Sequence, residues 1–223
     1  DHGHSPHTHG NVRLEEIQAQ LSRIFAKLQH DVPLHLFLSD DKDSPLNQAA
    51  REILLTISKI SPRIQVSEHT LDDELAKEKG VTSSPTILFD PEHYGLRWQG
   101  APLGEEGRMF IEALVMLGNR KSDLSEQSRR ILDRITSPRH VRVFVSMTCP
   151  YCPQQAVNAI KAAIKKPDLI SLEIIDIQAN PELAEKYSAQ SVPQTFADEK
   201  LIAMGAQAEE LFMLSLLKME QQT

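Results

Sequence analysis

The chain has 223 residues, of which 40% are hydrophobic, and a formal net charge of −7 at pH 7. This length suffices for one large domain or two of about a hundred residues, each with a buried core. Acidic and basic residues are interspersed, and no apolar run approaches the roughly 20 residues that span a bilayer. We therefore expect neither nucleic acid nor a membrane as a partner.

The first residues, "DHGHSPHTHG", contain four of the nine histidines of the chain among Gly, Ser, Pro and Thr. Such a composition cannot bury apolar surface, so a flexible His-rich tail is expected over residues 1–11. A tract of this kind has no fixed coordination geometry, and we expect no metal site in it.

Residues 12–120 then alternate between helical and strand patterns. Apolar residues at three- and four-residue spacing predict a helix from Val12. Turn signals and short apolar runs predict the following elements in order: a buried strand at 32–39, a helix at about 46–57, a strand at 63–69, a short helix ended by Gly80, a hairpin of 85–90 with 95–100, and a helix at 105–118.

The same order recurs after a connecting helix at 121–137. The predicted elements are a strand at 140–146, a helix at 154–164, a strand at 169–176, a helix at 181–188, a hairpin of 193–198 with 200–205, and a helix at 208–219. "LHLFLS" at 34–39 matches "VRVFVS" at 141–146, and "ELA" precedes Pro85 and Pro193 by the same spacing.

This repeat predicts an α/β fold of two tandem units, residues 12–120 and 138–223, each a mixed central sheet flanked by helices. Pro85 and Pro193 each open a strand after a short helix and a loop. A proline in such a tight turn is compatible with a cis peptide bond, and we expect one at Pro193.

Both cysteines of the chain lie in "FVSMTCPYCPQQ". One CxxC cannot supply the four ligands of a structural zinc site. Cys149 follows a buried strand at the start of a helix, where the helix dipole and free N–H groups favour a thiolate. Cys152, one turn later, is placed to attack a mixed disulfide formed by Cys149. A CxxC beside a βαβ pattern indicates thioredoxin-like redox chemistry, and Pro150 suits the first turn of the helix.

"TCPYCP" with "SVPQT" some forty residues later resembles a thioredoxin-fold active site with its cis-Pro loop. Over about residues 12–220 the chain resembles two groups: the protein disulfide oxidoreductases built from two fused thioredoxin-like units, and the N-terminal domain of the alkyl hydroperoxide reductase flavoprotein subunit. "GLRWQGAPLGEEGRMFIEAL" is similar to the segment "RFAGSPLGHEF" of that domain.

The resemblance implies that only the second unit is redox-active, since the first has "SDDKDSP" where the second has "SMTCPYCP". It also implies that Glu106, from the inactive unit, lies beside the redox pair as a general base for the resolving thiol. Glu105 is a rival for this role. The acid of ordinary thioredoxins corresponds to Val143, which is apolar, and Asp176 is a second candidate, although a strand-end Asp more often caps the next turn.

We therefore predict a thiol–disulfide oxidoreductase in which Cys149 attacks and Cys152 resolves. Pro193 and the backbone of Val192 are expected to shape the substrate groove, flanked by Pro150 and Tyr151. No GxGxxG motif occurs, so no bound cofactor is expected beyond the redox-active disulfide. Reducing equivalents would come from a separate reductase or flavoprotein domain, and the substrate would be a disulfide-bearing protein such as a peroxiredoxin.

Two alternatives stay open at this stage. "CPYC" also resembles glutaredoxin active sites, although "ADEKLIAMGAQAEE" lacks their Gly-rich glutathione turn. A non-catalytic module that captures a soft metal ion through CxxC and the His tail is the other. The direction of electron flow is not fixed by the residues, because it depends on the reduction potential.

Met147 and residues 203–206 could form an apolar rim, but Met204 is expected in the core.

The cytoplasm is the expected compartment. Two cysteines cannot build a disulfide framework, and no signal-peptide pattern is visible. The periplasm remains open because the sequence begins with Asp1 rather than Met.

Overall fold

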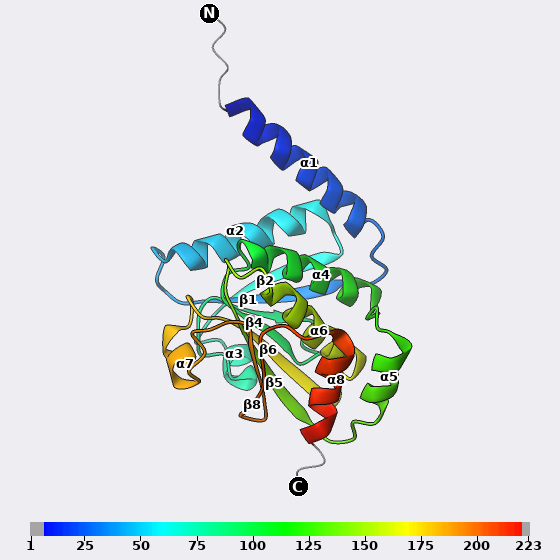
Figure 1. Cartoon of the computed structure of the whole chain (residues 1–223). Helices are drawn as coiled ribbons and strands as arrows, with labels where there is room; N and C mark the ends of the chain where they lie inside the picture. The colour runs from blue at the N-terminus through cyan, green and yellow to red at the C-terminus, as the bar shows by residue number, and fades with distance from the viewer. Residues whose placement is uncertain (1–6, 220–223) are drawn as a thin grey trace, which may run out of the picture.

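One eight-stranded mixed sheet runs through the computed structural model, which describes residues 7–219 (Figure 1). The strands are β1 Val32–Leu38, β2 Ile64–Thr70, β3 Thr86–Phe89, β4 Leu96–Gln99, β5 Arg139–Val145, β6 Ile170–Asp176, β7 Gln194–Ala197 and β8 Lys200–Met204. The helices are α1 His7–Phe25, α2 Pro45–Ile60, α3 Glu74–Lys79, α4 Glu105–Asn119, α5 Glu126–Asp133, α6 Cys152–Lys165, α7 Pro181–Lys186 and α8 Glu209–Leu217.

The strand order is β2-β1-β3-β4-β6-β5-β7-β8. In the first half β1 pairs in parallel with β2 and antiparallel with β3, and in the second half β5 pairs in the same ways with β6 and β7. The expectation of a separate central sheet in each unit is wrong, because β4 and β6 pair in parallel and join the halves. Hydrophobic alternation predicts strands but does not say which edges meet.

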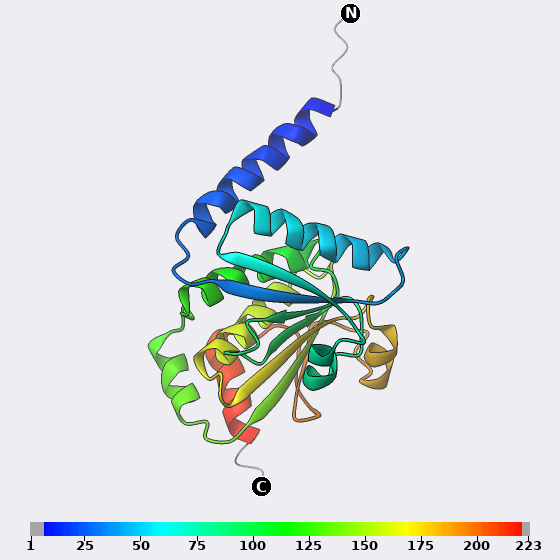
Figure 2. The same ribbon diagram turned by 180° about the vertical axis from the view of Figure 1, so that it is seen from behind.

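Helices cover both faces of this sheet, as the two opposite views in Figures 1 and 2 show. Alternate side chains of a strand point to opposite faces. Leu36 accordingly joins the large core under α2, α4, α6 and α8, whereas its neighbour Phe37 joins a small cluster under α3. Phe144 lies in the equivalent small cluster under α7.

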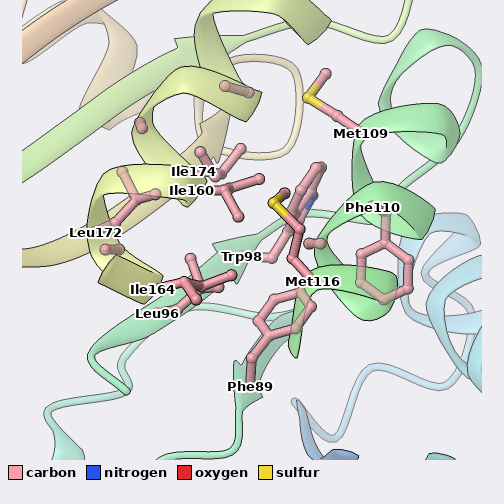
Figure 3. Close-up of a cluster of buried hydrophobic side chains, with 14 of the residues drawn as sticks. Phe89, Leu96, Trp98, Met109, Phe110, Met116, Ile160, Ile164, Leu172 and Ile174 are labelled. Atoms are coloured by element: carbon pink, nitrogen blue, oxygen red, sulfur yellow. The ribbon is translucent and has the colours of Figure 1, made fainter. Parts of the chain in front are cut away.

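The large core is continuous across the two halves of the sequence. Figure 3 shows Trp98 of β4 between side chains of α4, such as Phe110, and side chains of α6, such as Ile160. Trp98 is fully buried, and its ring meets that of Phe110 edge-on at a centroid distance of 5.5 Å. On the sheet, its register partner is Ile174 of β6. The two halves therefore share one hydrophobic interior.

Several element boundaries differ from the predictions by a few residues. α1 begins at His7 rather than at Val12, so the last residues of the expected tail are helical, while residues 1–6 lie outside the described residues. α5 spans only Glu126–Asp133 of the predicted 121–137. α6 begins at Cys152, two residues before the predicted 154–164, and Cys149 lies ahead of this helix rather than at its start. Within residues 7–219 we find no helix with the length and apolar character needed to cross a bilayer.

Candidate active site

The two cysteines are joined as a disulfide in the turn that connects β5 to α6. Their Cα atoms lie 5.5 Å apart, which is the ordinary separation for a bridged pair. Cys149 is 8% exposed and Cys152 is fully buried. The backbone N–H of Cys152 points at the Cys149 Sγ atom over 3.1 Å. An incoming nucleophile can thus reach Cys149 more readily than Cys152.

The loop before β7 closes over the Cys149 sulfur. The Val192–Pro193 peptide bond is cis, which confirms the prediction, and the corresponding Ser84–Pro85 bond of the first half is cis as well. The carbonyl oxygen of Val192 lies 3.8 Å from the Cys149 Sγ atom. Pro193 is buried, and its carbonyl accepts a hydrogen bond from the N–H of Gly205. The structure thus brings the CxxC motif and the predicted groove residues together.

Exposed apolar side chains lie around this site. Tyr151, between the two cysteines, is 69% exposed, and Met204 at the end of β8 is 67% exposed. Met204 pairs with Gln194, the residue that follows Pro193. The expectation that Met204 belongs to the core is therefore wrong, because the last residue of an edge strand projects beyond the helices that would cover it. Exposed apolar side chains around a reactive group are typical of a docking surface.

Glu106 lies in the first turn of α4 and is fully buried. The start of this helix is attached to the CxxC turn, since the N–H of Glu105 donates to the carbonyl of Met147 over 2.9 Å. Trp98 Nε1 donates to Glu106 Oε1 over 3.1 Å. Burial, and then the neighbouring carboxyl of Asp176, raises the pKa of Glu106 to about 10. Glu106 is therefore a protonated acid at neutral pH.

Asp176 ends β6 and is also fully buried. Its Oδ1 atom accepts hydrogen bonds from the N–H groups of Gln178 and Ala179, so the turn-capping interpretation is confirmed. It also contacts Glu106, so the rival candidates for the buried acid are neighbours. Glu105, the other rival, is only partly buried. Val143 is buried and apolar, as the sequence requires.

The equivalent place in the first half holds a network of neutral polar side chains. The hydroxyl of Ser84, beside the second cis proline, accepts from the N–H of Ser39 and donates to Asn47 Oδ1. Asn47 Nδ2 in turn donates to the Ser39 hydroxyl. These three residues satisfy one another where the second half has its disulfide. The first half therefore offers no thiol chemistry.

Metal-ligating side chains do not cluster in the described part of the chain. Among the described side chains, those of residues 15–219, no group of three or more His, Cys, Asp or Glu is placed to hold a metal ion. The side chains of the four histidines in the first ten residues lie outside this range.

A glycine is required where the first half meets the CxxC turn. Gly104 has φ +55°, and a Cβ atom there would lie 2.5 Å from the carbonyl oxygen of Met147. We expect Gly104→Ala to lower the free energy of unfolding by about 1–3 kcal/mol, because both the backbone conformation and the contact become unfavourable. Urea titration measures this loss. Gly107→Ala is the matched control, since its nearest contact would be an ordinary 3.4 Å and it lies inside α4; a loss as large as that of Gly104→Ala would contradict the argument.

Comparison with known proteins agrees with this geometry. Residues 139–218 match the model of the thioredoxin domain family. The second half of the chain is therefore similar to thioredoxin domains. Over 85% of its length, the chain is 29% identical to the alkyl hydroperoxide reductase AhpF of Staphylococcus epidermidis. The chain spans about a third of the length of that curated relative, 35%.

Two solved structures resemble this chain across both of its halves. A protein disulfide oxidoreductase from Aeropyrum pernix has a TM-score of 0.81 at 23% identity, with 93% of each chain covered. A domain of AhpF from Enterococcus faecalis has a TM-score of 0.78 at 26% identity, with 92% of this chain and 98% of that chain covered. The likeness therefore extends through both halves and includes the expected resemblance to both groups.

Two residues at the candidate site were not predicted from the sequence. Trp98 is the hydrogen-bond donor to Glu106, and Gly104 admits the Met147 carbonyl next to α4. The one signal in the sequence was that the lone tryptophan lies in the segment that resembles AhpF. Nothing in the sequence indicated the Gly104 contact, because its partner is more than forty residues away.

Proposed function

We propose that this chain is a thiol–disulfide oxidoreductase that exchanges disulfides with protein partners through Cys149 and Cys152. The disulfide beside a cis-proline loop is the observation that carries the proposal. Only Cys149 has exposed surface, and the rim around it is apolar. Small thiols need no apolar rim, so a protein substrate is favoured.

The reduced protein begins the exchange at Cys149. Its thiolate attacks one sulfur of the partner disulfide, the partner S–S bond breaks, and the leaving partner sulfur takes up a proton. The N–H of Cys152, which points at Cys149 Sγ, stabilises the negative charge of this thiolate before the attack. The product is a mixed disulfide between Cys149 and the partner.

Cys152 then resolves the mixed disulfide. It loses a proton and attacks Cys149 Sγ, so the internal disulfide forms and the partner leaves as a dithiol. Two electrons have passed from the cysteine pair to the partner. The same steps in reverse oxidise the partner's dithiol, and the difference between the two reduction potentials sets the direction.

Glu106 is proposed as the proton partner of Cys152. When the internal disulfide opens, Cys152 departs as a buried thiolate, and the protonated Glu106 supplies its proton. When the disulfide closes, the proton returns to Glu106. The burial of Glu106 and the bond between the start of α4 and the Met147 carbonyl support this role.

We also propose that the chain consists of two thioredoxin-like units, residues 12–120 and 138–223, joined by residues 121–137. The same strand pairings and a cis proline in each half support this division. The first unit would act as a support for the second. It contributes Glu106 and the Gly104 loop, while its own Ser39 network carries no thiol.

The partners follow from the likeness to AhpF. A peroxiredoxin disulfide is the proposed substrate, and a separate reductase or flavoprotein domain is the proposed electron source. Both proposals are supported by the 29% identity to this relative over 85% of the chain.

Trapping the mixed disulfide tests this function. Cys152→Ser removes the resolving thiol, so Cys149 should remain bound to a partner. We expect a covalent complex with a disulfide-bearing peroxiredoxin, visible on a non-reducing gel and released by dithiothreitol. The double variant Cys149→Ser with Cys152→Ser is the control and should form no complex. If Cys152→Ser forms none either, while the folded protein is intact by circular dichroism, the proposed order of attack is wrong.

A further inference from the structure

Two buried carboxyl groups meet where the halves of the chain join. Glu106 comes from α4 and Asp176 from the end of β6, and both are fully buried. Gly100 leaves room for the aspartate, since a Cβ atom there would lie 2.8 Å from Asp176 Cβ. Asp176 thus occupies the space left by the missing side chain of Gly100 in the first half. Glu106 and Asp176 therefore meet although they are far apart in the sequence.

The hydrogen bonds of this pair leave one oxygen on each side without a donor. Glu106 Oε1 accepts from Trp98, and Asp176 Oδ1 accepts from two backbone N–H groups. Within the described residues, no other group donates to Glu106 Oε2 or to Asp176 Oδ2. The carboxyl of Asp176 acts directly on that of Glu106, and two carboxylates cannot satisfy each other without a proton between them. A single proton between Oε2 and Oδ2 satisfies both atoms.

We propose that Glu106 and Asp176 hold one proton in common between their buried, donor-free oxygens, and that Asp176 is a positioning residue for the acid form of Glu106. Two buried carboxyl groups in contact share a proton because both cannot ionise together at low cost. The shared proton itself does not depend on the proposed function. Only its use by Cys152 rests on that function.

The two carboxyl groups differ in the donors around them, and Asp176 has more of them. Its Oδ1 atom accepts two backbone N–H groups, whereas Glu106 accepts one indole N–H, and donors stabilise the charged form. From the elements packed around Glu106, namely β4, β6, α4 and α6, Asp176 is the one charged group within the described residues that acts on it. Burial and this charge together raise the pKa of Glu106.

The pair has a defined part in the opening of the disulfide. A partner thiolate attacks Cys149 Sγ, and the Cys149–Cys152 bond breaks with its electron pair on Cys152. Cys152 takes the proton from Glu106, which leaves two buried negative charges side by side. This unfavourable state ends when the disulfide closes again, because Cys152 then returns its proton to Glu106 as it attacks Cys149 Sγ. Asp176 thereby makes Glu106 a strong proton acceptor during closure.

The pKa of Glu106 in the oxidised protein tests the proposal without requiring exchange activity. We expect the side-chain carboxyl carbon of Glu106, assigned with Glu106→Gln, to titrate near pH 10 by ¹³C NMR. In Asp176→Asn the charge is removed, while the amide oxygen can still accept the two N–H groups and the NH₂ group can donate to Glu106. The pKa of Glu106 should then fall by more than about one unit, a tenfold change in its dissociation constant.

The pH dependence of stability is a second readout. The pKa of Glu106 lies above its ordinary value of 4.5 in the folded protein, so the folded state binds more protons between pH 4.5 and about 10. The contribution of this group to the free energy of unfolding is therefore complete below about pH 4.5 and declines as the pH rises toward 10. In Asp176→Asn the pKa of Glu106 is expected to be lower, so its contribution to the free energy of unfolding should be lost at a lower pH. Urea titrations at several pH values across this range measure the difference.

Glu105→Gln is the matched control, because it removes the neighbouring acid on the same turn and should leave both readouts unchanged. An unchanged Glu106 titration in Asp176→Asn would overturn the proposal. If that variant does not fold, infrared spectroscopy of the unaltered protein is the test. The proposal requires a carbonyl band of a protonated carboxylic acid at pH 7, and Glu106→Gln must remove this band. The absence of such a band would contradict the proposal. Failure of Cys152→Ser to trap a partner would refute the proposed function but leave the shared proton intact.

Discussion

Cys149→Ser is expected to reduce the rate of disulfide exchange to background, a loss on the order of a thousandfold or more. Cys149 is the only cysteine of the pair with exposed surface, and serine is not ionised at neutral pH. Cys152 cannot substitute for it, because its side chain is fully buried behind the turn. The measurement is the reduction of a protein disulfide, with insulin or a peroxiredoxin as substrate, under a chemical reductant.

Tyr151→Ala is the control for this experiment. Its side chain lies between the two cysteines but is 69% exposed, so its loss should affect partner affinity rather than the exchange step. Exchange with a small disulfide such as oxidised dithiothreitol should be nearly unchanged in Tyr151→Ala and absent in Cys149→Ser. Retention of exchange by Cys149→Ser would rule out the redox interpretation of the CxxC motif.

Trp98→Ala is expected to cost about 3–5 kcal/mol of the free energy of unfolding. Trp98 is fully buried between α4 and α6, so the substitution leaves a large cavity in the core that the two halves share (Figure 3). It also removes the donor to Glu106 Oε1, which leaves a buried polar atom unsatisfied. Urea denaturation followed by far-UV circular dichroism measures the change.

Two variants separate these effects. Trp98→Phe keeps most of the packing and loses the indole N–H, so a smaller loss of about 1–2 kcal/mol is expected. Leu201→Ala, at a side chain that is 48% exposed, should change stability by less than about 0.5 kcal/mol. A loss below about 1 kcal/mol for Trp98→Ala would mean that the halves do not depend on a shared core.

The local features of the fold were predictable because they depend on near neighbours in the chain. Apolar spacing and turn residues placed every strand and helix from β1 to α8 within a few residues of its observed position. The CxxC motif at a strand-to-helix turn identified Cys149 and Cys152 without knowledge of the sheet. The cis bond at Pro193 was predictable too, because the same position recurs at Pro85 in the first half and the CxxC motif precedes it in the second.

The order of the elements, the redox pair and the lack of a nucleophile in "SDDKDSP" could all be predicted from the residues alone. The pairing of β4 with β6, the exposure of Met204 and the contact between Glu106 and Asp176 became known only from the three-dimensional fold. These facts depend on contacts between residues far apart in the chain, and a periodic pattern contains no information about which distant surfaces meet. The protonation of Glu106 follows from such a contact, because burial and a neighbouring charge act through space.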